Sequence, residues 1–178
     1  FPDIRQTSED GETQWQLDYA SATEKAKGPL LQKVKARGHW GHLILDEAQD
    51  FPPDAHRLLF VVQQRVFADV SDDEKPSVCL LADENQRLTA HNSTLAQIRE
   101  AYPGITPDDE YLLRRNYRNT KQIAEFAAHF HVGLESGRPD LPTTEGNKPH
   151  VLKATLDVAV DRVVTFARNN PDQEIGVL

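Results

Sequence analysis

The stretch that most constrains the fold of this chain is a short apolar run that ends abruptly in two acids. Leu43 to Leu45 form the run, and Asp46 and Glu47 follow it directly. A continuous apolar run of this length is typical of a strand covered on both faces in a parallel sheet. Open α/β sheets bind their ligands at the carboxyl ends of such strands. There, one acid can anchor a hydrated Mg²⁺ ion and the other can take a proton from water.

Two further apolar runs end in polar clusters in the same way. The run 77–82 leads into Asp83-Glu84-Asn85-Gln86, and the run 111–113 leads into Arg114-Arg115-Asn116-Tyr117-Arg118. Parallel strand ends share one edge of a sheet, so we expect the three clusters to converge on one crevice. Acids for the metal, an amide to orient water and an arginine to neutralise charge would suit a magnesium–triphosphate complex. Taken alone, a pair of acids after a strand is more typical of the start of a solvated loop.

Helical periodicity separates these runs. The spacing of apolar residues predicts helices over 55–66, 95–102, 120–130 and 160–167. Strands at 151–154 and from 175 onward would complete a βαβ unit around the last helix. Near the start of the chain, Trp15, Leu17 and Tyr19 alternate as in a strand, and 25–37 could be helical. We therefore expect an α/β fold with a mostly parallel sheet and flanking helices.

Composition restricts the environment and the partners. The chain has 178 residues and a net charge of -8, so general electrostatic attraction to nucleic acid is excluded and any such role must rest on motifs. No apolar run reaches the roughly 20 residues that a membrane span needs, and no signal peptide is evident, so we expect a cytoplasmic protein. The single Cys79 excludes an internal disulfide and is expected in the core. The histidines at 39, 42, 56 and 91 lack metal-ligand spacing and are interpreted as structural or solvated.

The ordered polar clusters resemble the motifs of superfamily 1 helicases of the UvrD/Rep type. Leu43 to Asp50 looks like their Walker B segment, Leu80 to Gln86 like their third motif, and Leu112 to Thr120 like their fourth. The resemblance implies a partial RecA-like P-loop NTPase core. Residues 1–118 would be the C-terminal part of the first RecA-like ATPase domain, and 119–178 the start of the second. Because the chain begins with Phe1 and contains no Met, we expect it to be a fragment.

The resemblance also implies roles for the Walker B-like residues. Asp46 would help to hold Mg²⁺, and Glu47 would be the general base for the water that attacks ATP. Gln49 would be a partner that links this motif to the third motif. The cofactors implied are therefore ATP and Mg²⁺.

Three residues of the later motifs receive roles in the same way. Gln86 would contact the terminal phosphate and couple it to the nucleic-acid surface. Tyr117 would stack on the adenine ring, and Arg118 would reach the γ-phosphate. The partner implied for the parent protein is single-stranded DNA.

The sequence departs from the family pattern in two places. No Gly-x-x-x-x-Gly-Lys-Ser/Thr stretch occurs in the 178 residues, so the phosphate-binding Walker A loop is missing. In the third motif Ala82 replaces the usual Gly, and Arg87-Leu88-Thr89 does not continue into the aromatic-Arg-Gly segment that touches DNA. We therefore expect the 178 residues alone to be inactive.

Three functional hypotheses remain open at this point. The first is a fragment of an ATP-dependent DNA helicase or translocase. The second is a degenerate ATPase-like module for binding or assembly, without turnover. The third is a self-contained magnesium phosphohydrolase that uses Asp46, Glu47, Asp83 and Glu84 directly. The sequence leaves the oligomeric state and the choice between DNA and RNA undetermined.

Overall fold

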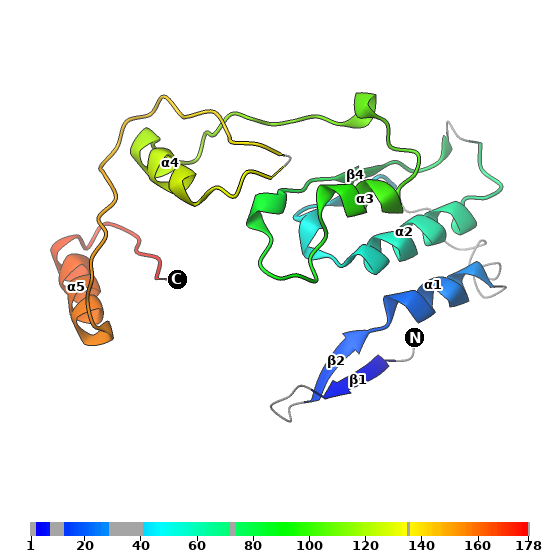
Figure 1. Cartoon of the computed structure of the whole chain (residues 1–178), viewed down its shortest axis with the longest axis horizontal. Helices are drawn as coiled ribbons and strands as arrows, with labels where there is room; N and C mark the ends of the chain where they lie inside the picture. Colours follow the sequence, from blue (N-terminus) through cyan, green and yellow to red (C-terminus); the bar gives the residue numbers. More distant parts are fainter. Residues whose placement is uncertain (1–2, 8–12, 29–40, 72–73, 135, 178) are drawn as a thin grey trace. The chain divides into compact units, whose positions relative to one another are not determined.

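The computed structural model describes residues 3–7, 13–28, 41–71, 74–134 and 136–177. It divides into two compact units. The first comprises Phe1–Arg115 with Phe130–Asp140, and the second comprises Asn116–His129 with Leu141–Leu178. Figure 1 shows the elements of each unit. Among the described residues, no helix is both long enough and apolar enough to span a bilayer.

Two parallel strands form the centre of the first unit. Strand β3 (Leu43–Leu45) pairs with β4 (Val78–Leu80), and Ile44 lies opposite Cys79. The ladder continues past the strands, because the amide of Leu81 donates to the carbonyl of Leu45 at 2.9 Å. The two carboxyl ends therefore lie side by side, as the sequence predicts. In the described residues this small parallel sheet and its helices are compatible with the α/β class.

Two helices pack on one face of this sheet. Helix α2 (Pro53–Val66) begins at a proline, which suits the first helical turn. Helix α3 (Leu95–Ala101) begins with a capping box, in which Thr94 and Gln97 exchange side-chain-to-backbone hydrogen bonds. The core between sheet and helices consists of Ala48, Ile98, Ala101 and Tyr102, with Leu45, Leu59, Phe60, Val78, Leu80 and Ile105 packed against them.

The opposite face of the β3–β4 sheet is exposed. Ile44 is 65% exposed, and its cross-strand neighbour Cys79 is exposed as well. Alternate residues of a strand point to opposite faces, so only every second side chain reaches the helical layer. The expectation that these strands are covered on both faces is therefore wrong for the described residues, as is the expectation that Cys79 lies in the core.

A hairpin and a helix precede this layer. Strands β1 (Asp3–Thr7) and β2 (Thr13–Leu17) are antiparallel, and α1 (Tyr19–Lys27) packs against α2. The predicted strand stops at Leu17 because Asp18 caps the helix by accepting a hydrogen bond from the Ser21 amide at 2.9 Å. The predicted helix over 25–37 coincides only with the end of α1, and residues 29–40 are outside the described ranges.

The third apolar run does not form the predicted strand. A short 3-10 turn, η5 (Pro107–Asp109), precedes it, and the run 111–113 is not part of a sheet. Tyr111 and Leu113 are 87% and 88% exposed. Pairing begins only at Arg115, which forms an isolated parallel bridge with Asp140. The apolar character of the run is therefore not used for packing in this unit.

The second unit contains two helices in its described residues. Helix α4 (Lys121–Ala127) continues into the turn η6 (Ala128–Phe130), and α5 (Leu156–Asn169) follows a long connection. Both helices agree with the predicted periodicity. The strands predicted at 151–154 and from 175 are absent from the residues described. The valines of α5 that were expected to face inward, Val160, Val163 and Val164, are 37% to 51% exposed.

Candidate active site

The two acids after β3 lie in a tight turn, which we call the acidic turn (residues 46–50). Both Asp46 and Glu47 are exposed. Glu47 has φ 50° and ψ 44°, and it is the single non-glycine residue with positive φ in the described part of the chain. This left-handed conformation costs an L-residue about 1–2 kcal/mol. The turn then continues into η2 (Ala48–Asp50). Strain of this kind is often found where a backbone must aim a functional side chain.

Gln49 joins the acidic turn to the end of β4. Its side chain is almost fully buried, with 1% of the residue exposed. The amide Nε2 donates to Oε2 of Glu47 at 2.7 Å, and Oε1 accepts the backbone N–H of Asp83 at 3.0 Å. One side chain therefore orients the Glu47 carboxylate and fixes it relative to the second polar cluster.

The second cluster forms its own hydrogen-bonded turn, η4 (Glu84–Gln86). Asp83 accepts from the Asn85 amide at 3.0 Å and from the Gln86 side chain at 2.9 Å. Glu84 is buried, and its Oε2 accepts the backbone N–H of Leu95 at 3.0 Å. A carboxylate at the start of a helix stabilises it, so Glu84 serves the architecture of α3.

A polar loop that the sequence analysis did not single out holds the acidic turn from one side. We call residues 89–93 the clasp loop. Asn92 donates from Nδ2 to Asp50 at 3.0 Å, and its Oδ1 accepts the Thr89 amide at 3.0 Å. The Ser93 amide donates to the carbonyl of Gln49 at 2.8 Å. Thr, Asn and Ser residues close together often hydrogen-bond to nearby backbone groups. This composition is the sequence signal that could have predicted the clasp loop.

A buried histidine also holds the acidic turn. His56 of α2 is 1% exposed, and its Nε2–H donates to the carbonyl of Ala48 at 2.9 Å. The ring makes T-shaped contacts with Phe51 and Tyr102, with centroid distances of 6.1 Å and 5.9 Å. Burial lowers the pKa of His56, and the bond to Ala48 opposes this more weakly. In the sequence, His56 lacks metal-ligand spacing to other residues, and no pattern there predicted that it would support the turn.

The acid and amide residues predicted for the site form one connected set. The Glu47 amide donates to Asp46 at 3.0 Å. Gln49 joins the Glu47 carboxylate to the backbone N–H of Asp83. The Asp83 carboxylate in turn accepts from the Gln86 side chain. Such a network fixes several side chains at once and strengthens each bond in it.

Tyr117 and Arg118 belong to the second unit and are exposed there. They lie in a turn before α4 in which the Asn116 side chain accepts the backbone N–H groups of Arg118 and Asn119, both at 3.1 Å.

The donor set of the acidic turn has the chemistry that Mg²⁺ prefers. Oδ1 of Asp46 accepts the Glu47 amide, while Oδ2 can face a hydrated ion. Mg²⁺ keeps several waters and often takes only one or two protein carboxylates. The described residues contain no cluster of three or more His, Cys, Asp or Glu side chains that could enclose a metal. A metal site here would therefore use Asp46 together with water and oxygen atoms of a ligand.

No protein-family model matches this sequence, and a search of curated proteins found no match.

Proposed function

We propose that this chain supplies the magnesium-binding and water-activating part of an ATP hydrolysis site in a DNA helicase or translocase of the UvrD/Rep type. One observation carries the proposal. The Walker B-like and third-motif segments follow adjacent parallel strands, and Gln49 connects them with hydrogen bonds of 2.7 Å and 3.0 Å. That arrangement puts acids and amides together at a strand end, where α/β sheets bind ligands.

Each residue of the acidic turn then has a distinct task. Asp46 offers a carboxylate oxygen to hydrated Mg²⁺, which when bound would neutralise charge on the triphosphate. Glu47 accepts the proton of the attacking water, and its carboxylate is aimed by the Gln49 amide. Gln86, held by Asp83, senses the terminal phosphate. A base fixed by a buried amide needs little reorganisation before it reacts.

The rest of the proposal concerns the parts around this turn. Tyr117 stacks on adenine, and Arg118 neutralises γ-phosphate charge in the transition state. The protein moves along single-stranded DNA and acts in the cytoplasm. The chain contributes to a RecA-like core, with 1–118 in the first domain and 119–178 in the second. The Walker A loop comes from sequence outside the 178 residues, so the chain alone does not hydrolyse ATP.

The test is ATP turnover by the longer protein that includes the Walker A loop, with and without single-stranded DNA. We expect DNA to stimulate turnover, and we expect Asp46→Asn to lower it and to raise the Mg²⁺ concentration needed for half-maximal rate. Asp54→Asn is the matched control, because Asp54 pairs with Arg57 on the surface of α2. Equal rates and equal Mg²⁺ dependence in the wild type and Asp46→Asn would overturn the proposal.

A second candidate is a binding or assembly module that keeps the fold without turnover. The altered third motif favours it, because Leu88 is 88% exposed where the family has its DNA-contacting segment. This candidate predicts that the longer protein binds ATP without hydrolysing it at any DNA concentration.

The self-contained phosphohydrolase is disfavoured by the engagement of Glu84 with the start of α3. It predicts Mg²⁺-dependent turnover of a simple phosphate ester by the 178 residues alone, and we expect none.

A further inference from the structure

His56 supports the backbone of the acidic turn at one atom. Its Nε2 lies 2.9 Å from the carbonyl oxygen of Ala48, the residue between Glu47 and Gln49. A carbonyl can only accept, so Nε2 must carry the proton in this bond. The tautomer of the ring is thereby fixed, and the lone pair of the neutral ring is on Nδ1.

The other ring nitrogen, Nδ1, has no acceptor nearby for a proton among the described residues. Nδ1 of His56 is buried, and no hydrogen-bond partner for it exists in the described residues. The rings of Phe51 and Tyr102 flank the imidazole. A second N–H on Nδ1 would thus be a buried donor without an acceptor among the described residues. The pocket accepts the neutral ring and disfavours the imidazolium.

We propose that His56 is a positioning residue of the acidic turn, and that its neutral Nε2–H tautomer holds the Ala48 carbonyl so that Glu47 keeps its left-handed backbone and its bond to Gln49. Loss of this bond frees the carbonyl between the two residues that aim the carboxylate. The catalytic meaning of the proposal rests on the function proposed above, whereas the structural part does not.

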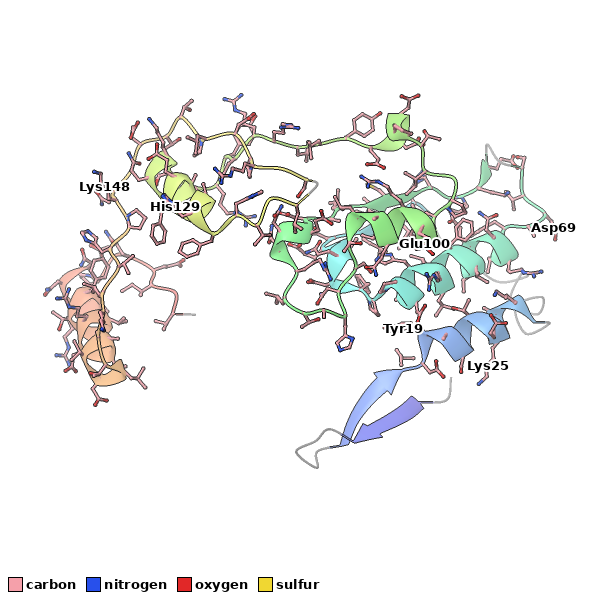
Figure 2. The ribbon with its side chains drawn as sticks, viewed as in Figure 1. Tyr19, Lys25, Asp69, Glu100, His129 and Lys148 are labelled. Atoms are coloured by element: carbon pink, nitrogen blue, oxygen red, sulfur yellow. The ribbon has the colours of Figure 1, made fainter. Side chains whose placement is uncertain are left out.

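The acids on the elements around His56 are engaged with other partners. The acids on the elements packed around the ring are Asp46, Glu47, Asp50, Asp54 and Glu100, and the bases are Arg57, Arg65 and Arg99. Each of the acids accepts a hydrogen bond from a group other than His56, and Arg57 serves both Asp54 and Glu100. Glu100 of α3, labelled in Figure 2, bonds to Arg57 at the surface. Tyr102 stays neutral because burial raises the pKa of its hydroxyl.

The first test uses the 178-residue chain and the NMR signals of the acidic turn. Between pH 8 and pH 5, we expect the amide signals of Glu47 and Gln49 to move together with the ring signals of His56, with one midpoint below the ordinary histidine value of about 6.5. His91→Gln is the matched control, since His91 is an exposed histidine of the clasp loop and should leave this titration unchanged. Turn amides that stay fixed while the His56 ring titrates would overturn the proposal.

Two substitutions separate positioning from packing. His56→Gln keeps an N–H donor for the Ala48 carbonyl and removes the titrating group, so we expect near-wild-type signals of the acidic turn at pH 7 and no pH response between 8 and 5. His56→Leu fills the pocket without a donor, so we expect the signals of Glu47 and Gln49 to shift while those of α3 remain. Equal effects of the two substitutions on the turn would contradict a positioning role.

Activity of the longer protein gives the second readout. We expect His56→Leu to lower kcat for ATP about 10-fold with little change in KM, and His56→Gln to restore most of that loss. Glu47→Gln is measured in parallel. If Glu47→Gln left turnover unchanged, the proposed function would fail, whereas the NMR titration would still decide the role of His56.

Discussion

The side-chain amide of Gln49 donates to the carboxylate of Glu47 at 2.7 Å while its oxygen accepts the backbone N–H of Asp83. This buried side chain connects the ends of β3 and β4 in addition to the backbone bond between Leu81 and Leu45. The bonds of Gln49 orient the Glu47 carboxylate with both strand ends in the positions they already have. Stability and site geometry should therefore depend on the same side chain.

Truncation of Gln49 tests this connection. Gln49→Ala leaves the Asp83 N–H without its acceptor and opens a small cavity, so we expect a loss of about 2–3 kcal/mol in the free energy of unfolding. Gln64→Ala, at an exposed position of α2, should change stability by less than about 0.5 kcal/mol. Urea unfolding of the two variants beside the wild type measures the difference. Equal stabilities would mean that Gln49 does not hold the strand ends together.

The backbone of Glu47 makes a second prediction. Glu47→Gly and Glu47→Ala lose the same bond to Gln49, but only alanine keeps a Cβ in the left-handed region. We expect the glycine variant to be more stable than the alanine variant by about 1 kcal/mol, which reverses the usual order of these residues. Thermal unfolding of the pair provides the measurement. An alanine variant at least as stable as glycine would rule out left-handed strain at this position.

The pH dependence of stability follows from His56. Its pKa is lowered in the folded state by burial, so the unfolded chain takes up the proton more readily. The contribution of His56 to stability is complete above the unfolded pKa of about 6.5 and is lost as the pH falls toward the folded pKa, by at most about 1.4 kcal/mol per pH unit. Urea unfolding at pH 7.5 and 5.5 measures this slope. In His56→Gln the slope should be reduced, and an unchanged slope would exclude His56 as its source.

The Asn92→Asp variant should show the opposite pH dependence of stability. Asn92→Asp replaces the donor that faces Asp50 with a second carboxylate, so we expect a loss of about 1–3 kcal/mol at pH 7. Acidification toward pH 4 should recover part of this loss, because protonation of one carboxyl removes the repulsion. Asn92→Ala is the control, since it also loses the bond to Asp50 but adds no charge, and it should show no such recovery. Parallel pH curves for the two variants would contradict the contact with Asp50.

The sequence predicts the parts of this molecule that depend on local pattern. Leu43–Leu45 and Val78–Leu80 are short apolar runs flanked by turn residues, and their pairing places the two polar clusters together as expected. The helices α2, α3, α4 and α5 follow the apolar spacing, because periodicity reports an amphipathic face directly. The position of Gln49 in the Walker B-like segment predicted that it would link the two polar clusters.

Other features depend on partners that a sequence pattern does not specify. The run 111–113 has the composition of a strand, but a strand needs a neighbour to pair with, and pairing here begins only at Arg115. The left-handed backbone of Glu47 could not be predicted, because glycine or asparagine normally marks such a position. His56 lacked any motif, and its role arises from the fold of α2 against the acidic turn. Whether Tyr117 and Arg118 act with Glu47 stays a prediction.

The most direct test of the central claim is single-turnover ATP hydrolysis by the proposed longer protein with its Walker A loop and by its Glu47→Gln variant, measured with protein in excess over ATP and with saturating Mg²⁺ and single-stranded DNA. Glutamine preserves the size of the side chain and can still bond to Gln49, but it cannot accept a proton at neutral pH. The account predicts that the variant binds ATP as tightly as the wild type and hydrolyses it about 10²–10⁴-fold more slowly. Hydrolysis at the wild-type rate by the variant would contradict the assignment of Glu47 as the base.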